Sequence, residues 1–513
     1  SVTDSNLLLT FVGSPRSMIR RTFLTLAFMI SVLYVRGYEI NWSKELPDNG
    51  RFPSLKILGT YDNGYYILRS NIDFDEEGIP SGRTRRFLLI ALSEALIEQW
   101  EVEIVPVIAD SKILDVQLLD GKVLVTSYSD RTTGSGYEIR AQFIGSDGKF
   151  IGTPVLIEEF PDARFDSERR PSVTFSKDGS KIALCYRRST ENELSQLISV
   201  IVLDSAFQRQ YKREWTIASP IRRFSPTEFV ITNEGSFYLL GVQYQTDKRV
   251  KEPGESYFLL TGYDPASDRQ LNREIRLENK FLTNVSIAVD AINRKIVVAG
   301  LYSEIGMLAS AGVFYCGMTA DSLSYSNVYW APFTNDLLTK AISDRGDPKK
   351  KELFNYYVDR LILRKDGGAA IIAESYVETT RTFWDYYTQT VITHTYYRYG
   401  NILLASINPD GGMLWNRLIQ KEQNSMDDNG NESSYCSMIS GGKIFTVFNK
   451  YIDRRSSVMI TRLDGTGALQ TDVLFQESER ISVIARAARQ VDEHTLLLPA
   501  LRQGEYYVAK ITF

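Results

Sequence analysis

The stretch Asn401–Ile419, NILLASINPDGGMLWNRLI, contains two apolar runs on either side of the turn Asn-Pro-Asp-Gly-Gly, and the second run carries Trp415. This pattern predicts a β-hairpin, because the chain can reverse at the Gly and Pro residues and can pair and bury the apolar runs. We expect this hairpin to be the outer half of a four-stranded module that recurs along the chain.

Eight stretches repeat a first hairpin of the same kind. If each turn is located by its Gly or, where it has none, by its Asn or Asp, the turns fall at positions 64, 121, 179, 235, 293, 367, 442 and 492. The first four intervals between successive turns are 57, 58, 56 and 58 residues. A second hairpin follows each of the first seven. A near-constant interval between turns indicates a sequence repeat. Two hairpins per repeat give four strands, which is the number in a propeller blade. A β-sandwich, the alternative, does not predict this fixed grouping by four.

The last unit lacks a fourth strand before the chain stops at Phe513. Residues 38–46, YEINWSKEL, can supply it, and their Trp42 matches the fourth-strand residues Trp100, Trp215, Trp330 and Trp415. We therefore predict an all-β fold in which residues 38–513 form a single eight-bladed β-propeller domain, with the N-terminal strand completing the last blade and closing the ring. Closure removes sheet edges that would pair with other chains. We interpret the five Trp rings as packing between blades.

The N-terminal region has the pattern of a secretory signal peptide at residues 18–37. Arg20 and Arg21 follow Met18, the apolar run Thr22–Val35 comes next, and the small residue Gly37 ends it. The run is shorter than the roughly 20 residues that span a bilayer. We expect a periplasmic or extracellular protein with no stable membrane span after signal cleavage, a retained anchor being the alternative. Residues 1–17 are interpreted as an upstream or non-native segment.

Composition and residue spacing give no sign of a metal, a cofactor or a nucleic acid. The formal net charge of −4 comes from interspersed charges of both signs, so no basic footprint for nucleic acid is present. The three cysteines, at 185, 316 and 436, form no CxxC motif, and we expect free thiols. The two histidines, at 394 and 494, are isolated in the sequence and do not support a catalytic triad.

Four long insertions fall where a propeller has the loops of one face. They are residues 70–86, 334–355, 377–400 and 420–434, and the second is expected to hold a short helix at Asp336–Ser343. Three of the four adjoin blade 6. Long loops on a rigid scaffold are usually functional, so we place the working surface on this face, over blades 5 to 7.

The candidate binding residues lie in the two insertions that flank Asn401–Ile419. The first insertion is rich in Thr and Tyr and predicts extended strands, whose aromatic rings suit a protein or sugar surface unless they pack on themselves. The second is acidic and rich in amides. Its oxygens suit calcium, but the spacing differs from an EF-hand loop and favours a solvated turn. The predicted binding residues are Trp384, Tyr386, Tyr387, Tyr396, Tyr397, Asp427, Asp428 and Asn429.

The Trp-bearing fourth strands, the Gly/Asp turns and the eight units resemble the quinoprotein-like eight-bladed propellers, a group that includes pyrroloquinoline-quinone alcohol dehydrogenases and the BamB outer-membrane assembly lipoprotein. The adjacent Cys pair of the dehydrogenases and the anchor Cys of the lipoprotein are absent. The segment from Ala373 through Trp415 to Ser425 also resembles secreted Bacteroidota proteins without an assigned activity, and the plug subunits of the type IX secretion translocon. These resemblances are architectural and imply little about function.

Two functions remain open from the sequence. The first is an exported, non-catalytic propeller that binds an envelope or outer-membrane protein, or a glycan, through the long-loop face. The second is a polysaccharide-active hydrolase or lyase with carboxylates at the propeller axis. The second requires a deep pocket lined by Asp, Glu, Tyr or Arg from several blades.

Overall fold

The computed structural model describes residues 37–47, 50–72, 85–161, 171–189, 194–246, 250–277, 279–325, 327–343, 352–387, 389–452 and 456–513. The predicted segment 1–17 and, Gly37 apart, the predicted signal peptide lie outside these ranges. So do residues 73–84 and 344–351 of two predicted insertions. No helix in the described ranges is long and apolar enough to cross a membrane.

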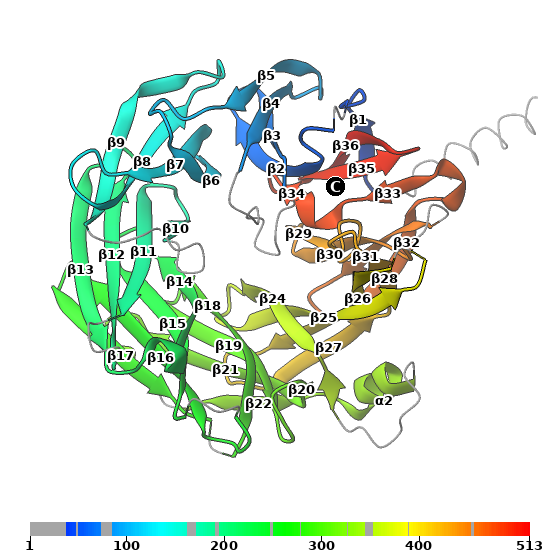
Figure 1. Cartoon of the computed structure of the whole chain (residues 1–513). Coiled ribbons are helices and arrows are strands. Elements are labelled where there is room, and N and C mark those ends of the chain that lie inside the picture. The colour runs from blue at the N-terminus through cyan, green and yellow to red at the C-terminus, as the bar shows by residue number, and fades with distance from the viewer. Residues whose placement is uncertain are drawn as a thin grey trace, which may run out of the picture.

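The described strands pair into eight antiparallel sheets of at least four strands and one two-stranded sheet. Figure 1 shows the large sheets arranged as the blades of a ring, with the chain following the ring in order. The fold is therefore an all-β propeller, as the repeat predicted. We number the sheets as blades 1 to 8 in chain order.

Blades 1 to 4 each contain four consecutive strands. Blade 1 consists of β2 (Ser54–Tyr61), β3 (Gly64–Ser70), β4 (Phe87–Ser93) and β5 (Glu98–Ile104). Blade 2 consists of β6 (Lys112–Leu119), β7 (Lys122–Asp130), β8 (Gly136–Ile144) and β9 (Phe150–Pro161). Blade 3 consists of β10 (Ser172–Phe175), β11 (Lys181–Ser189), β12 (Gln196–Asp204) and β13 (Arg209–Ile217). Blade 4 consists of β14 (Phe224–Ile231), β15 (Phe237–Tyr244), β16 (Ser256–Asp264) and β17 (Arg269–Ile275), after the short helix η2 (Ile221–Arg223).

Blades 5 to 8 carry the additions. Blade 5 consists of β18 (Phe281–Asp290), β19 (Lys295–Ser303), β21 (Gly312–Thr319) and β22 (Tyr329–Pro332). Blade 6 consists of β24 (Tyr356–Leu363), β25 (Ala369–Asp385), β26 (Thr390–Ile407), β27 (Met413–Ile419) and β28 (Gln423–Met426). Blade 7 consists of β29 (Cys436–Ser440), β30 (Lys443–Asn449), β31 (Val458–Leu463) and β32 (Leu469–Phe475). Blade 8 consists of β33 (Ile481–Val483), β34 (Arg489–Gln490), β35 (Thr495–Arg502), β36 (Glu505–Thr512) and β1 (Glu39–Trp42).

Several short elements accompany the main strands of the blades. The predicted short helix is present as α2 (Asn335–Ser343), between blades 5 and 6. The two-stranded sheet joins β20 (Ala309–Ser310) to β23 (Leu353–Phe354). The short helices η3 (Glu477–Glu479) and η4 (Ala485–Ala487) lie in the last part of the chain.

The ring is closed as predicted, because β1 pairs antiparallel with β36 in blade 8. Glu39 lies opposite Thr512, and Trp42 lies opposite Ala509. In Figure 1 this dark-blue strand lies beside the red strands of the last blade. The ring of Trp42 lies 5.3 Å from that of Phe475 in blade 7, so the closing strand also packs against the preceding blade.

Burial follows the position of a strand within its blade. The second strand of blade 1, β3, is buried along its whole length, whereas the residues of its outermost strand, β5, are exposed or partly buried except for Ile104. Both faces of an inner strand contact neighbouring blades, which explains the continuous apolar runs of the sequence. One hydrophobic cluster accordingly joins Tyr66 and Phe87 of blade 1 to Val123 of blade 2.

Two of the repeated tryptophans, Trp100 and Trp415, connect their blade to the next one by a hydrogen bond. Trp100 Nε1 donates a hydrogen bond to the Ser146 carbonyl at 2.9 Å, and Trp415 Nε1 donates to the Gly465 carbonyl at 3.0 Å. Both acceptors lie in the outer turn of the following blade. Gly467, two residues beyond the second acceptor, has a positive φ of 82° and lies against the Trp415 ring. The structural interpretation of these tryptophans is confirmed at both junctions.

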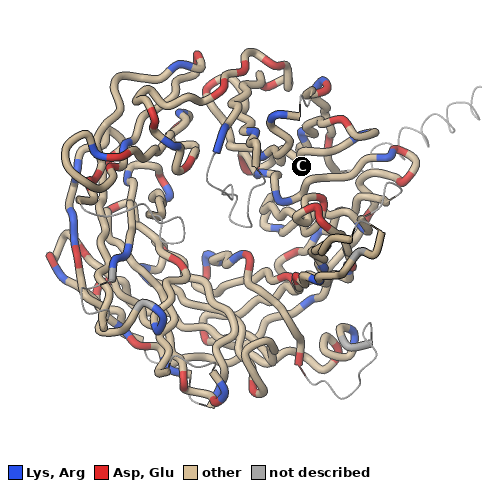
Figure 2. Tube along the Cα trace, viewed as in Figure 1, with Lys and Arg blue, Asp and Glu red and all other residues tan. Residues whose placement is uncertain are grey.

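A β-bulge recurs in the innermost strand of five blades. The unpaired residue in the ladder is, in chain order, Leu58, Leu114, Thr227, Thr283 and Asp359. In two of these blades, the residue after the bulge forms a hydrogen bond with the next blade. Glu228 accepts a hydrogen bond from the Ile287 backbone N–H, and Asn284 accepts one from Val358. Figure 2 shows charges of both signs interspersed around the ring.

Candidate functional site

The hairpin of β25 and β26 extends well beyond its blade. Its strands are 17 and 18 residues long, whereas the corresponding strands of blade 1 have 7 each. Pairing continues to Asp385 and Thr390 at its end. The Thr-rich and β-branched sequence of this insertion favours extended strands, because branched side chains fit a pleated surface. The prediction of strands at 377–400 is confirmed.

The end of this hairpin exposes large aromatic side chains. Trp384 is 54% exposed, Tyr386 is 84% exposed and Tyr387 is 100% exposed. Phe383 and Val391 beside them are also exposed. We call these five residues the aromatic tip. Most of this surface faces solvent, and the Phe383 ring also lies 6.1 Å from the ring of His394 on the neighbouring strand.

The base of the hairpin is attached to the second predicted insertion. β28 pairs with Tyr396–Tyr399 of β26, so the amide-rich loop adds a strand to blade 6. Asp427 then accepts hydrogen bonds from the Thr395 backbone N–H at 2.7 Å and contacts His394 Nδ1 at 2.6 Å. These hydrogen bonds, of which the one from His394 is the largest cause, hold the pKa of Asp427 below its ordinary value.

The eight predicted binding residues therefore separate into two groups. Trp384, Tyr386 and Tyr387 lie at the tip, whereas the other five belong to the base. Tyr397 donates its hydroxyl hydrogen bond to Asn429 Oδ1 at 3.1 Å, and the Arg381 guanidinium lies 5.6 Å from the Tyr396 ring centre. Asp428 Oδ1 accepts the Gly430 N–H at 2.9 Å. Five of the predicted residues thus have contacts that support the hairpin from within.

The acidic loop gives no calcium-like cluster in the described ranges. No group of three or more His, Cys, Asp or Glu side chains is placed there to hold a metal ion. The three cysteines are free, and burial raises the pKa of each to about 12. His494 Nδ1 lies 3.1 Å from Ser440 Oγ, but the Asp492 carboxylate accepts the His494 backbone N–H and not its ring.

A buried ion pair lies under the linker that leads to β28. Lys421 Nζ is 2.5 Å from Glu374 Oε1, and the two side chains are 0% and 5% exposed. Lys421 also donates to Gln423 Oε1 at 2.9 Å, and Ser434 donates to Glu374 Oε2. Burial lowers the pKa of Lys421, while the Glu374 carboxylate opposes that shift. The pair fixes the path of the linker across the junction of blades 6 and 7.

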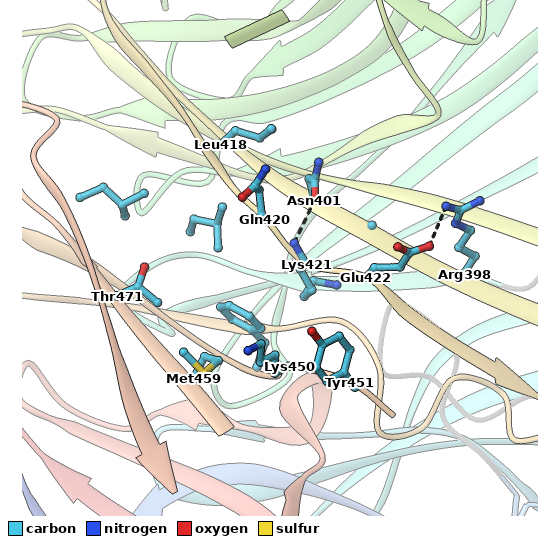
Figure 3. A pocket seen from close by; sticks show the side chains of 14 residues that line it. Arg398, Asn401, Leu418, Gln420, Lys421, Glu422, Lys450, Tyr451, Met459 and Thr471 are labelled. Atoms are coloured by element: carbon cyan, nitrogen blue, oxygen red, sulfur yellow. Dashed lines mark hydrogen bonds and ion pairs between the residues drawn. The ribbon is translucent and has the colours of Figure 1, made fainter. Parts of the chain in front are cut away.

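An outer groove of about 650 Å³ lies between blades 6 and 7 on the long-loop side. Figure 3 shows its lining, in which Leu418 and Met459 contribute apolar surface and Lys450 lies near Tyr451. At one end Arg398 is paired with Glu422 at 2.8 Å. This volume is within the ordinary range for ligand pockets, roughly 300–1,000 Å³.

An inner pocket of about 240 Å³ lies on the axial side of the same junction. The bulge of β24 places Asp359 here, where Thr or Leu stands in the other bulged blades. Asp359 Oδ2 accepts a hydrogen bond from Tyr435 Oη at 2.7 Å. Burial, and next the Asp359 charge, raise the pKa of Tyr435 well above its ordinary value. Arg360 and Arg486 also line this pocket.

Sequence reasoning did not identify the inner pocket. Its residues come from blade 6, blade 7 and η4 of blade 8, and none lies in the four long insertions except Tyr399 and Ser434. The one signal that could have revealed it is the charged pair Asp359-Arg360 inside an otherwise apolar first strand. A bulge beside a functional site commonly redirects such a side chain.

Comparison with known proteins supplies no family. No protein-family model and no curated protein matches the sequence. Among solved structures, the chain is similar to the WD40 domain of SCAP from fission yeast, with 10% identity, a TM-score of 0.37, and coverage of 93% of this chain and 98% of that one. It is also similar to the β-propeller domain of the Trilobed protease from Pyrococcus furiosus, with 11% identity, a TM-score of 0.33, and coverage of 78% and 95%. At such low identities and TM-scores, these likenesses say nothing about function.

Proposed function

We propose that this chain is an exported, non-catalytic, eight-bladed propeller that binds an envelope or outer-membrane protein, or a glycan, through the aromatic tip. The observation that carries the proposal is the exposure of Trp384, Tyr386 and Tyr387 at the end of a braced two-stranded ribbon. Tyr and Trp are enriched among binding hot spots, because their large rings gain contact area at a small cost in conformational entropy.

The bracing of the ribbon supports the same proposal. A loop with this composition would lose conformational entropy on binding, whereas the pairing of β26 with β25 and β28 has already fixed the backbone. Asp427 secures the base at the point where β28 ends. The aromatic tip is therefore presented to solvent on a preorganised support.

The test is site-specific photo-crosslinking in the native envelope of the producing cell. A photoreactive residue replaces Tyr387 in one variant and Ile292 in the control, because Ile292 is 72% exposed in a short turn on the opposite side of the blade repeat. We expect a discrete crosslinked partner from position 387 only. The yield should fall by roughly tenfold or more when Trp384→Ala and Tyr386→Ala are added. Equal crosslinking at both positions, or none at 387, would refute the proposal.

Export rests on the sequence pattern of residues 18–37 and has its own test. We expect Edman or mass-spectrometric sequencing of the protein from the periplasm or medium to find a mature N-terminus near Tyr38. Recovery of the intact N-terminal segment in the membrane fraction would favour a retained anchor instead.

A polysaccharide-active enzyme is the second candidate, and the inner pocket is the observation that favours it. Its lining contains Asp359, Glu374, Tyr435 and arginines from several blades. Both carboxylates already have partners, since Glu374 pairs with Lys421 and Asp359 accepts from Tyr435, so we rank binding first. Release of new reducing or unsaturated ends from a polysaccharide panel, abolished by Asp359→Asn, would reverse this order.

A further inference from the structure

The inner pocket differs from the aromatic tip in place and in chemistry. It lies at the axial junction of blades 6 and 7, and its volume of about 240 Å³ is below the roughly 300 Å³ at which pockets for drug-sized ligands begin. A single-ring ligand matches this size. A ligand in this pocket would bind independently of the aromatic tip.

Three tyrosine rings form a row along the pocket wall. The ring centres of Tyr376 and Tyr399 are 4.6 Å apart, and those of Tyr357 and Tyr376 are 6.4 Å apart. Tyr399 is buried, Tyr376 is half-buried and Tyr357 is 41% exposed, so the row runs from the interior to the mouth of the pocket. The Tyr376 and Tyr399 rings face each other, so Tyr357 at the mouth is the exposed ring of the row that can accept the C–H face of a sugar ring and leave its hydroxyl groups for polar partners.

Two arginines of the pocket lack a carboxylate partner among the described residues. Arg360 Nη1 donates to the carbonyl and hydroxyl of Ser437, in the position where Glu228 and Asn284 contact the next blade elsewhere. Arg486 Nη2 donates to the carbonyls of Asn429 and Gly430, and its guanidinium lies 5.5 Å from the Tyr399 ring centre. These partners are neutral, so the hydrogen bonds themselves offset neither positive charge.

The negative charges around the pocket do not fully cancel the positive charges of the two arginines. Glu374 is neutralised by Lys421, at 2.5 Å. Asp359 is bonded to the Tyr435 hydroxyl, which is neutral, so it offsets one arginine at most. The five charged groups therefore leave one net positive charge, and Asp359 adds an exposed hydrogen-bond acceptor at the mouth. Burial lowers the pKa of Arg360.

We propose that the inner pocket binds a uronic acid, the carboxylate-bearing form of a hexose. The ligand carboxylate is held by Arg486 and Arg360, because guanidinium groups match carboxylate geometry with paired N–H donors. Its ring lies on the exposed Tyr357 ring at the mouth, and one of its hydroxyl groups donates to Asp359. The site therefore distinguishes acidic from neutral sugars of a glycan.

The experiment is isothermal titration calorimetry of the full chain with glucuronate and galacturonate, each compared with its neutral counterpart, glucose or galactose. Acetate provides the carboxylate without the ring. We expect a uronate to bind at least tenfold more tightly than its neutral sugar and than acetate, with an affinity that falls as salt rises. Three results would overturn the proposal. They are equal affinity for the neutral sugar and the uronate, binding of acetate without binding of either uronate, and no binding of any of these compounds.

Two arginine variants separate a ligand contact from a structural role. Arg486→Gln removes the charge but retains amide donors for the Asn429 and Gly430 carbonyls, and we expect a loss of uronate affinity of at least tenfold with unchanged thermal unfolding. Arg489→Gln is the matched control, since Arg489 follows in the same blade but does not line the pocket. Equal affinity loss in both variants, or none in Arg486→Gln, would overturn the assignment.

Discussion

Replacing Lys421 by Met should destabilise the protein far more than an ordinary surface change. The side chain of Lys421 is fully buried, and that of its partner Glu374 is 5% exposed. Met retains the aliphatic volume of Lys, so the dominant effect is an uncompensated buried carboxylate. Removing one partner of such a pair costs about 3–5 kcal/mol of unfolding free energy.

The double variant tests the cause of that loss. Adding Glu374→Gln to Lys421→Met removes the stranded charge and keeps an acceptor for the Ser434 hydroxyl. We expect the double variant to regain about 1–3 kcal/mol relative to Lys421→Met alone.

Urea-induced unfolding followed by tryptophan fluorescence provides the measurement. The control is Lys340→Met, because Lys340 pairs with Asp336 at 2.9 Å on the exposed surface of α2, with side chains that are 63% and 77% exposed. That change should cost less than about 0.5 kcal/mol. If Lys421→Met also costs less than about 1 kcal/mol, or if the double variant is no better than the single one, the reasoning from burial is wrong.

Three further predictions concern the Trp415 junction, the attachment of β28 to the long hairpin, and the closure of the propeller ring. Gly467→Ala should lower the free energy of unfolding by about 1–3 kcal/mol, because φ is 82° and the new Cβ would lie 2.6 Å from Trp415 Cγ; Gly465→Ala, with no atom within 4 Å, should cost less in the same urea assay. The pKa of Asp427 is lowered in the folded state, so the stability it contributes is present above its ordinary value of 3.8 and is lost as the pH falls through the lowered pKa. The protection of amides in β28 and around His394 against hydrogen exchange, expressed relative to the intrinsic rate at each pH, should therefore fall at acidic pH in the wild type but already be low at neutral pH in Asp427→Ala. Deleting β1 should expose the edge of β36 and produce concentration-dependent association by light scattering, whereas a monodisperse monomer would contradict the role assigned to closure.

The repeat could be predicted from the sequence because its signals are local. Gly and Asp turns, apolar runs and a Trp in the fourth strand occur within single hairpins, as in Asn401–Ile419. Ring closure followed from counting strands, and the pairing of β1 with β36 confirms it. The strands of the long hairpin were predictable for the same reason, since Thr, Val and Tyr favour extended backbone.

The contacts of the candidate site could not be predicted, because they join residues distant in the sequence. Gln423–Met426 has no apolar alternation, and it becomes a strand only because β26 extends far enough to pair with it. Lys421 looks like a residue of a polar linker, yet its side chain is fully buried against Glu374. The exposure of the aromatic tip depends equally on where the two strands end in space.

Closure of the ring also imposes an order on folding. β1 precedes every other strand of the propeller, but its partner β36 is the last strand of the chain, so blade 8 cannot be completed until all the intervening blades have been synthesised. The equilibrium cost of this long separation is modest, since each doubling of a loop adds only about 0.6 kcal/mol. Its kinetic cost is larger, because distant pairing slows folding. Until that step, β36 presents an unpaired edge that any extended segment of matching length can occupy, so a chaperone or a competing peptide acting on this protein has its opportunity at the seam.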